Sequence, residues 1–196
     1  MPLADDQGLF LHASAVVVGG GAFLFLGHST AGKSTIARLL GNSFPVIADD
    51  AVYARQGPDG LWRVVDGSFR FGRDAMQDWA EEVRRRAAGA DAVRLSGCLR
   101  IHKGEGVRIE PLVPSGLARC LMDAVMEIDL QRKFGRTPHG GSFHPGTPLA
   151  VREMRRCWFH RVGEIARTHP GWHLWFAKDS GESELAETLS RMAQES

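Results

Sequence analysis

Residues 27–35, GHSTAGKST, combine two glycines, a lysine and a serine at a spacing suited to phosphate chemistry. They match the pattern G-x-x-x-x-G-K-[ST], the Walker A motif. In such a loop the backbone N–H groups point inward, and the helix that follows adds its positive N-terminal end. The segment lies between the apolar run AFLFL and the helix-like stretch IARLL, which is the context the motif requires. The sequence therefore predicts a site for the phosphates of a nucleotide.

Each chemical group of this loop has an expected task. Lys33 is expected to reach the β- and γ-phosphates, and the Ser34 hydroxyl is expected to be a ligand of Mg²⁺. Thr35 can support the start of the helix. The predicted nucleotide-binding residues are Gly27, His28, Ser29, Thr30, Ala31, Gly32, Lys33, Ser34 and Thr35. The expected cofactors are therefore ATP and Mg²⁺.

A pair of adjacent carboxylates, Asp49 and Asp50, follows the short apolar run FPVI. In nucleotide-binding folds, a carboxylate at the carboxyl end of a neighbouring strand faces the metal. Two carboxylates could divide the work between binding Mg²⁺ and accepting a proton from an attacking hydroxyl. Alternatively, one aspartate is the metal ligand and the other starts a turn. The residues alone leave both interpretations open.

The elements that must position these groups are expected to form one α/β domain over residues 1–196. Strand-like runs at 9–18 and 22–26, joined by glycines, predict a hairpin that leads into the loop. A second hairpin is expected from 51–56 and 61–67 around PDG. Further along we expect an amphipathic helix at 73–89 and two strands around the turn KGEG within 93–112. The remaining expected elements are helices at 115–130 and 149–168, a strand at 171–179 and a helix from Glu184.

Composition excludes several other classes of protein. The 196 residues are 43% hydrophobic and carry a net charge of +1, so nothing indicates a nucleic-acid partner. No apolar run approaches the ~20 residues that span a bilayer, and the N-terminus lacks a targeting pattern. We therefore expect no membrane partner and a cytoplasmic location. The three cysteines, Cys98, Cys120 and Cys157, are typical of reduced structural thiols.

The order of these motifs resembles a known family. LHASAVVVGGGAFLFLGHSTAGKSTIARLL followed by FPVIADDAV is similar to the catalytic core of the HPr kinase/phosphorylase family and its shorter relatives. The resemblance covers residues 9–54 and rests on His12, the hairpin, the loop and the paired aspartates. It implies a mixed β-sheet of the HPr kinase and phosphoenolpyruvate carboxykinase type, with β-hairpins and a helical C-terminal part. A homo-oligomer is also plausible on this resemblance.

The resemblance also implies roles for single residues. It makes Asp49 the general base, His12 the residue that tunes or shares its proton, and Asp50 the Mg²⁺ partner of Ser34, although the division between Asp49 and Asp50 could be reversed. The position after Ser34 is Thr35, where the family typically has Glu, and an EIRG-like signature is absent from the sequence. These departures favour an acceptor other than HPr.

The leading hypothesis is a kinase that transfers the γ-phosphoryl group of ATP to a hydroxyl of a peptide, protein or small molecule, most simply a serine. A non-catalytic nucleotide-binding regulatory protein and a small-metabolite kinase with a parallel sheet are the alternatives. Arg70 and Arg73 are candidates for a charge-stabilising arginine. Loop 135–148, with His139, Ser142 and His144, is either a lid or acceptor-binding loop or a disordered surface connection. The Cys157 and His160 pair lacks the partners of a zinc site.

Overall fold

The computed structural model describes residues 8–68, 83, 85–87, 89, 91–134, 148–177 and 181–195. Within them, nine strands form one mixed sheet in the order β1-β5-β6-β7-β3-β2-β4, with β9 beside β7 and β8 beside β9. The strands are β1 (Gly8–His12), β2 (Ser14–Val18), β3 (Gly21–Leu26), β4 (Val46–Ala48), β5 (Ala51–Gln56), β6 (Trp62–Asp66), β7 (Val93–Lys103), β8 (Arg108–Leu112) and β9 (Gly171–Phe176). The helices are α1 (Lys33–Leu40), α3 (Pro114–Phe134), α4 (Pro148–Thr168) and α5 (Glu182–Glu195).

The sheet is mixed, as the sequence predicts. Strands β3, β7 and β9 are parallel, whereas β2 pairs antiparallel with both β3 and β4. The two expected hairpins are confirmed: β2 and β3 are joined through Gly19 and Gly20, both at positive φ, and β5 pairs antiparallel with β6. The alternative of a core built only from parallel strands is wrong for this chain.

One edge of the sheet collects the residues with candidate chemistry. Because β2 runs opposite to both β3 and β4, the carboxyl ends of β3 and β4 lie at the same edge. The glycine loop, residues 27–35, begins there after Leu26, and the acidic pair Asp49 and Asp50 follows β4 at the same edge. Strand β1 also ends there with His12. Side chains far apart in sequence are thus brought together by strand direction alone.

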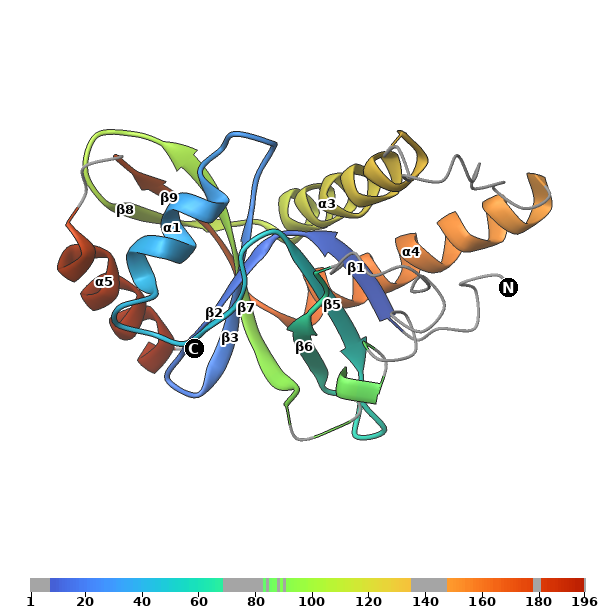
Figure 1. Cartoon of the computed structure of the whole chain (residues 1–196), viewed down its shortest axis with the longest axis horizontal. Coiled ribbons are helices and arrows are strands. Elements are labelled where there is room, and N and C mark those ends of the chain that lie inside the picture. Colours follow the sequence, from blue (N-terminus) through green and yellow to red (C-terminus); the bar gives the residue numbers. More distant parts are fainter. Residues whose placement is uncertain are drawn as a thin grey trace, which may run out of the picture.

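Helices cover both faces of the central strands, which explains why β3 is buried along its whole length. α1 and α5 lie together, and α3 and α4 lie together in a different part of the molecule (Figure 1). Alternate side chains of β3 enter different cores. Phe23 and Phe25 pack with Ile36, Leu40, Leu185 and Leu189, whereas Leu24 and Leu26 belong to the core that contains Leu117, Leu121, Val162 and Ile165.

Two expected elements differ in detail. Residues 9–18 form two strands, because the chain changes partners at Ala13: β1 pairs with β5, whereas β2 pairs with β3 and β4. The backbone N–H of Ala13 donates to the carbonyl of Asp50 at this break (3.2 Å). The two strands around KGEG are present, but β9 pairs with both of them. That pairing joins segments about sixty residues apart, which local patterns do not reveal.

Some predictions fall outside the described residues. Most of the expected helix at 73–89 lies there, although residues 83 and 85–87 are helical. Loop residues 135–147 also lie outside, and the structure places Pro148 at the start of α4. In the part of the chain that is described, no helix is long and apolar enough to cross a membrane.

Candidate functional site

The glycine loop after β3 needs glycine at two positions, Gly27 and Gly32. Gly32 adopts φ 108° and ψ 18°, and an added Cβ would lie 2.9 Å from Cζ of Phe176, so glycine is needed for both conformation and space. A Cβ on Gly27 would lie 2.8 Å from the Cβ of Ala31. Thr30 is the only non-glycine residue at positive φ (72°) in the described part of the chain. The loop therefore holds a tightly curled backbone before helix α1.

Lys33 folds back across this loop. Its Nζ donates hydrogen bonds to the carbonyl oxygens of Gly27 (2.7 Å) and His28 (3.2 Å), and only 5% of the residue is exposed. Burial lowers the pKa of Lys33, while the nearby carboxylates of Glu127 and Asp50 act in the opposite direction. A cation is thus held at the mouth of the loop, where the phosphates of a nucleotide would need it.

The other predicted loop residues lie as follows. His28, Ser29 and Thr30 form the exposed tip of the loop, and Ser34 is also exposed at the start of α1. The N–H of Ala31 donates to the carbonyl of His28 (3.0 Å), which closes a turn at the tip. Thr35 is half-buried in the first turn of α1. A ligand can therefore reach Ser34 from solvent.

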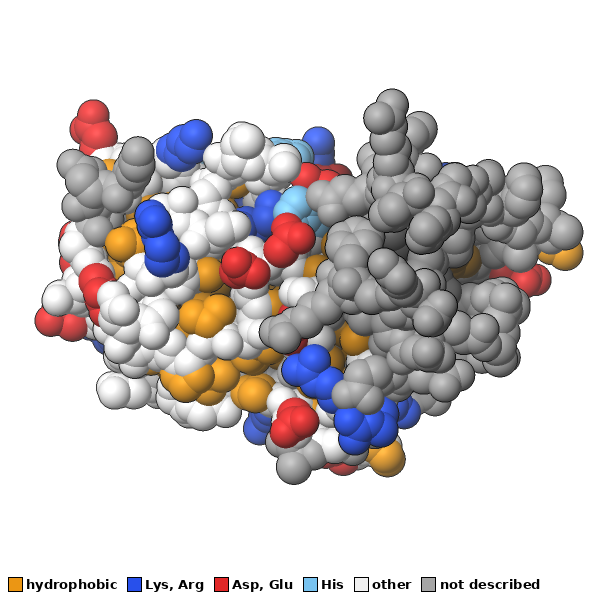
Figure 2. All heavy atoms as spheres, viewed as in Figure 1, with side chains coloured by type: hydrophobic (Ala, Val, Ile, Leu, Met, Phe, Trp, Pro, Cys, Tyr) orange, Lys and Arg blue, Asp and Glu red, His pale blue; other side chains and the backbone are white. Residues whose placement is uncertain are grey.

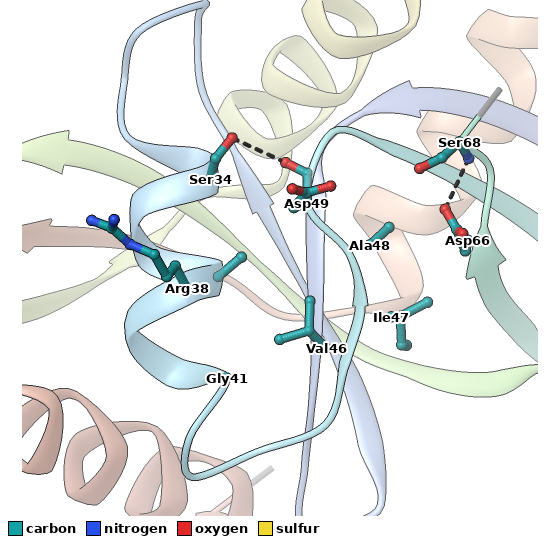
Figure 3. Close-up of a pocket in the computed structure, with 10 residues that line it drawn as sticks. Ser34, Arg38, Gly41, Val46, Ile47, Ala48, Asp49, Asp66 and Ser68 are labelled. Carbon is teal, nitrogen blue, oxygen red and sulfur yellow. Dashed lines mark hydrogen bonds between the residues drawn. The ribbon is translucent and has the colours of Figure 1, made fainter. Parts of the chain in front are cut away.

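Asp49 lies beside Ser34 (Figure 3). The Asp49 carbonyl accepts hydrogen bonds from the hydroxyls of Ser14 (2.9 Å) and Ser34 (3.4 Å), so the bend after β4 is tied to both β2 and α1. Ser34 and Asp49 line a hollow of about 490 Å³ together with Ala37, Arg38, Gly41, Val46, Ile47, Ala48, Asp66 and Ser68. The hollow gives a ligand access to the side of the loop that carries the serine hydroxyl.

Asp50 belongs to a second arrangement, centred on His12. The Nε2 of His12 lies 3.2 Å from Oδ1 of Asp50, and the Nδ1 lies 3.2 Å from Oε2 of Glu127. The imidazole is almost fully buried, with 7% of its side chain exposed, whereas 66% of the Asp50 side chain is exposed. Acidic, basic and histidine side chains gather near the middle of the molecular face that Figure 2 shows. His12 thus holds a carboxylate that an incoming molecule can reach.

This arrangement bears on the roles expected from sequence. The resemblance paired His12 with Asp49 and gave Asp50 to the metal. In the structure His12 contacts Asp50, and Asp49 is the aspartate beside Ser34. The two aspartates are brought to the same site because the chain bends after β4, so that adjacent residues do not have to point to opposite faces.

Glu127 is the part of the site that sequence reasoning missed. It lies on α3, and its Oε1 accepts the backbone N–H of Ser29 (3.2 Å) while its Oε2 faces His12. In the sequence, Glu127 is only a glutamate beside the apolar face of a helix that includes Val125 and Ile128. Charged residues are common at that position in amphipathic helices, so the sequence did not single it out. Nearly a hundred residues separate Glu127 from Ser29, so only the folded chain reveals the contact.

The donor set suits Mg²⁺ bound together with a nucleotide. Mg²⁺ takes oxygen ligands and usually uses one or two carboxylates, several waters and substrate phosphates. Ser34 and the adjacent acidic pair can supply the protein's share of such a set. Among the described residues, no group of three or more His, Cys, Asp or Glu side chains is suited to hold a metal ion.

Several other candidates do not join this site. His160 and Cys157 lie on α4, where His160 pairs with Glu164 (3.5 Å), and Cys157 is one of the free cysteines. Arg70, Arg73 and the loop residues His139, Ser142 and His144 lie outside the described residues. Burial raises the pKa of the Cys98 thiol, which is consistent with a structural cysteine.

Comparisons with known proteins find distant likeness among solved structures alone. No model of a known protein family matches the chain, and no curated protein is similar to it in sequence. Among solved structures, the chain is similar to the Hpr(Ser) kinase/phosphatase from Coxiella burnetii, with 12% sequence identity and a TM-score of 0.39 over 95% of this chain and 94% of that chain. This is a distant structural relationship only, so the chemistry of the site has to be argued from its own residues.

Proposed function

We propose that this protein is an ATP- and Mg²⁺-dependent kinase that transfers the γ-phosphoryl group to a hydroxyl of a peptide, a protein or a small molecule. The observation that carries the proposal is the meeting of a buried lysine in a glycine loop with a histidine-held aspartate at one edge of the sheet. A loop alone argues only for phosphate binding. An exposed carboxylate beside the loop adds a group that can receive the acceptor's proton.

The roles follow from where each group lies. Loop N–H groups and Lys33 would bind the phosphates, while Ser34 and Asp49 would hold the metal. Bound Mg²⁺ would offset negative charge on the phosphate oxygens. Asp50, held by His12 and exposed to solvent, is the proposed base. This assignment reverses the division between the aspartates that the resemblance first suggested.

The proposed step is an in-line displacement. The acceptor oxygen forms a bond to the γ-phosphorus as the bond from that phosphorus to the bridging oxygen of ADP breaks. The hydroxyl proton passes to Asp50. Lys33 and the loop N–H groups would stabilise charge on the transferring and leaving oxygens, which is where phosphoryl-transfer enzymes gain most of their rate.

The test is phosphoryl transfer from labelled ATP to a panel of serine peptides, proteins and small alcohols. We expect Lys33→Met to lower transfer by about 100-fold or more, since it removes the cation of the loop. The matched control is Lys103→Met, because Lys103 is an exposed lysine at the end of β7. Thermal unfolding of both variants checks that the fold is retained.

Two results would count against the kinase assignment. One is ATP binding without transfer to any acceptor class, unaffected by Asp50→Asn, which would instead support a nucleotide-binding regulatory protein. The other is transfer that survives Lys33→Met.

A further inference from the structure

We propose that Glu127 is a positioning residue that sets the His12 and Asp50 pair against the glycine loop. The reaction it serves is the proposed function above, on which this inference rests. The contacts of Glu127 with Ser29 and His12 are present in the structure whether or not that function is correct. Glu127 is supplied by α3, outside the segment where the motifs occur.

The carboxylate of Glu127 connects two parts of the site. One oxygen accepts the N–H of Ser29 in the loop, and the other lies 3.2 Å from His12 Nδ1. The opposite ring nitrogen of His12 faces Asp50 at the same distance. A continuous chain of polar contacts therefore runs from the phosphate loop through Glu127 and His12 to the proposed base.

Helix α3 gives Glu127 a fixed origin. Four residues on its buried side, Leu117, Leu121, Ala124 and Val125, belong to a core that also contains Leu9 and Leu11 of β1. His12 is the last residue of that same strand. With 25% of its side chain exposed, Glu127 is partly withdrawn from water, and hydrogen bonds to its charge are correspondingly stronger.

The hydrogen-bonding capacity of histidine explains what Glu127 controls. An ionised carboxylate can only accept, so Glu127 requires a proton on His12 Nδ1 and ionised Asp50 requires one on Nε2, and the two contacts together fix the orientation of the ring. The ring orientation in turn keeps Nε2 directed at Asp50. Without Glu127, nothing in this chain of contacts would tie the imidazole to the loop.

The effect of Glu127 on the position of His12 can be separated from its effect on ATP binding, because the second depends on its charge. Glu127 accepts the N–H of Ser29 in the same loop whose Gly27 and His28 carbonyls hold Lys33 Nζ, so its negative charge lies near the cation that phosphates need. Removing the charge should leave ATP binding unchanged or slightly stronger. A positioning role therefore predicts that variants which lose the geometry lower kcat more than they raise KM for ATP.

The experiment compares two conservative variants with opposite expectations. Glu127→Gln keeps the length: its amide oxygen can accept from Ser29, and its amide nitrogen can donate to Nδ1 of a neutral His12 that carries its proton on Nε2, toward Asp50. Glu127→Asp keeps the charge but is one methylene too short to reach both partners. The matched controls are Asp123→Asn and Asp123→Glu, at an exposed position one turn earlier on α3.

We expect Glu127→Asp to lower kcat by about 10- to 100-fold with KM for ATP changed less than about threefold, because a small misplacement of a catalytic group has effects of this size. Glu127→Gln should stay within about tenfold of the wild type. Equal activity of Glu127→Asp and its control, or a larger loss in Gln than in Asp, would overturn the proposal.

A second readout does not depend on turnover. The NMR signals of the ring nitrogens of His12, assigned with His12→Gln, should shift strongly in Glu127→Asp and not in either Asp123 variant. If the wild type transfers no phosphate, the proposed function fails, and these signals alone decide whether Glu127 positions His12. Unchanged His12 signals in Glu127→Asp would contradict the inference.

Discussion

Asp49 and Asp50 are adjacent in sequence but have different surroundings. Asp49 is tied through its carbonyl to two serine hydroxyls and lies beside the exposed Ser34, whereas the Asp50 side chain is held by a buried imidazole. A carboxylate next to a serine hydroxyl suits the metal, and one held by histidine while open to solvent suits proton transfer. The surroundings of each side chain, and not its place in the motif, distinguish the two proposed roles.

This difference predicts separable kinetic effects. Asp50→Asn should lower kcat by about 100-fold or more, since it removes the proposed base, with little change in the Mg²⁺ concentration needed for half-maximal rate. Asp49→Asn should raise that Mg²⁺ concentration by about tenfold while much of the maximal rate is retained at saturation. Rates measured across a Mg²⁺ titration provide the check, with the exposed Asp91→Asn as control. The opposite pattern would instead make Asp49 the base and Asp50 the metal ligand, as the resemblance implies.

At the scale of elements, the sequence predicts the parts that depend on neighbouring residues. The strand before Gly27, the helix after Gly32 and the turn at Gly19 and Gly20 follow from local composition and spacing. Contacts across long separations could not be predicted. The insertion of β9 between β7 and β8 is one example, and the reach of Glu127 to Ser29 is another.

The difference between local patterns and long-range contacts also decides which site residues could be predicted from the sequence. His12, Lys33 and Asp50 could be named because they stand in a recognisable order within about forty residues. Which aspartate His12 would contact could not be read from that order, because the answer depends on the bend after β4 and the register of β1 against β5. Glu127 stands in no motif.

A methyl group added at Gly32 should have a larger effect on stability and ATP binding than one added at Gly20. Gly32→Ala places a Cβ at positive φ and against Phe176, so it should destabilise the fold by about 1–3 kcal/mol and weaken ATP binding by about tenfold or more. Gly20→Ala has a similar φ (+83°) but no atom within 4 Å of the added Cβ, and its cost should be about 1–2 kcal/mol with ATP binding unchanged. Denaturant unfolding and ATP titration measure both effects. Equal ATP affinity in the two variants would argue that the loop does not bind phosphate.

At the scale of the whole molecule, one sheet joins the elements that the site draws upon. The loop continues from β3, the acidic pair follows β4, and Glu127 comes from a helix packed on β1.

Burial also changes the pKa of two histidines. Where α4 leads into β9, burial lowers the pKa of His169 below its ordinary value of 6.5, and His102 is affected in the same direction by the same cause.

The lowered pKa of His169 predicts how stability depends on pH. Because the folded chain keeps this imidazole neutral, the unfolded chain binds more protons, so this contribution to stability is complete above the ordinary pKa and is lost as the pH falls below it. We expect Tm to fall between about pH 7.5 and about pH 5.5, with His169 contributing about 2–4 °C. His169→Gln should flatten this part of the profile, whereas the exposed His160→Gln should not. Identical pH profiles for wild type and His169→Gln would refute this expectation.

The most direct test of the central claim is a crystal structure of the protein with Mg²⁺ and a non-hydrolysable ATP analogue. The account predicts that the β- and γ-phosphates lie in the glycine loop against Lys33, with Mg²⁺ beside Ser34 and Asp49. It also predicts that the Asp50 carboxylate, still held by His12, lies on the open side of the terminal phosphate. Phosphates bound elsewhere, or an Asp50 carboxylate turned away from them, would contradict it.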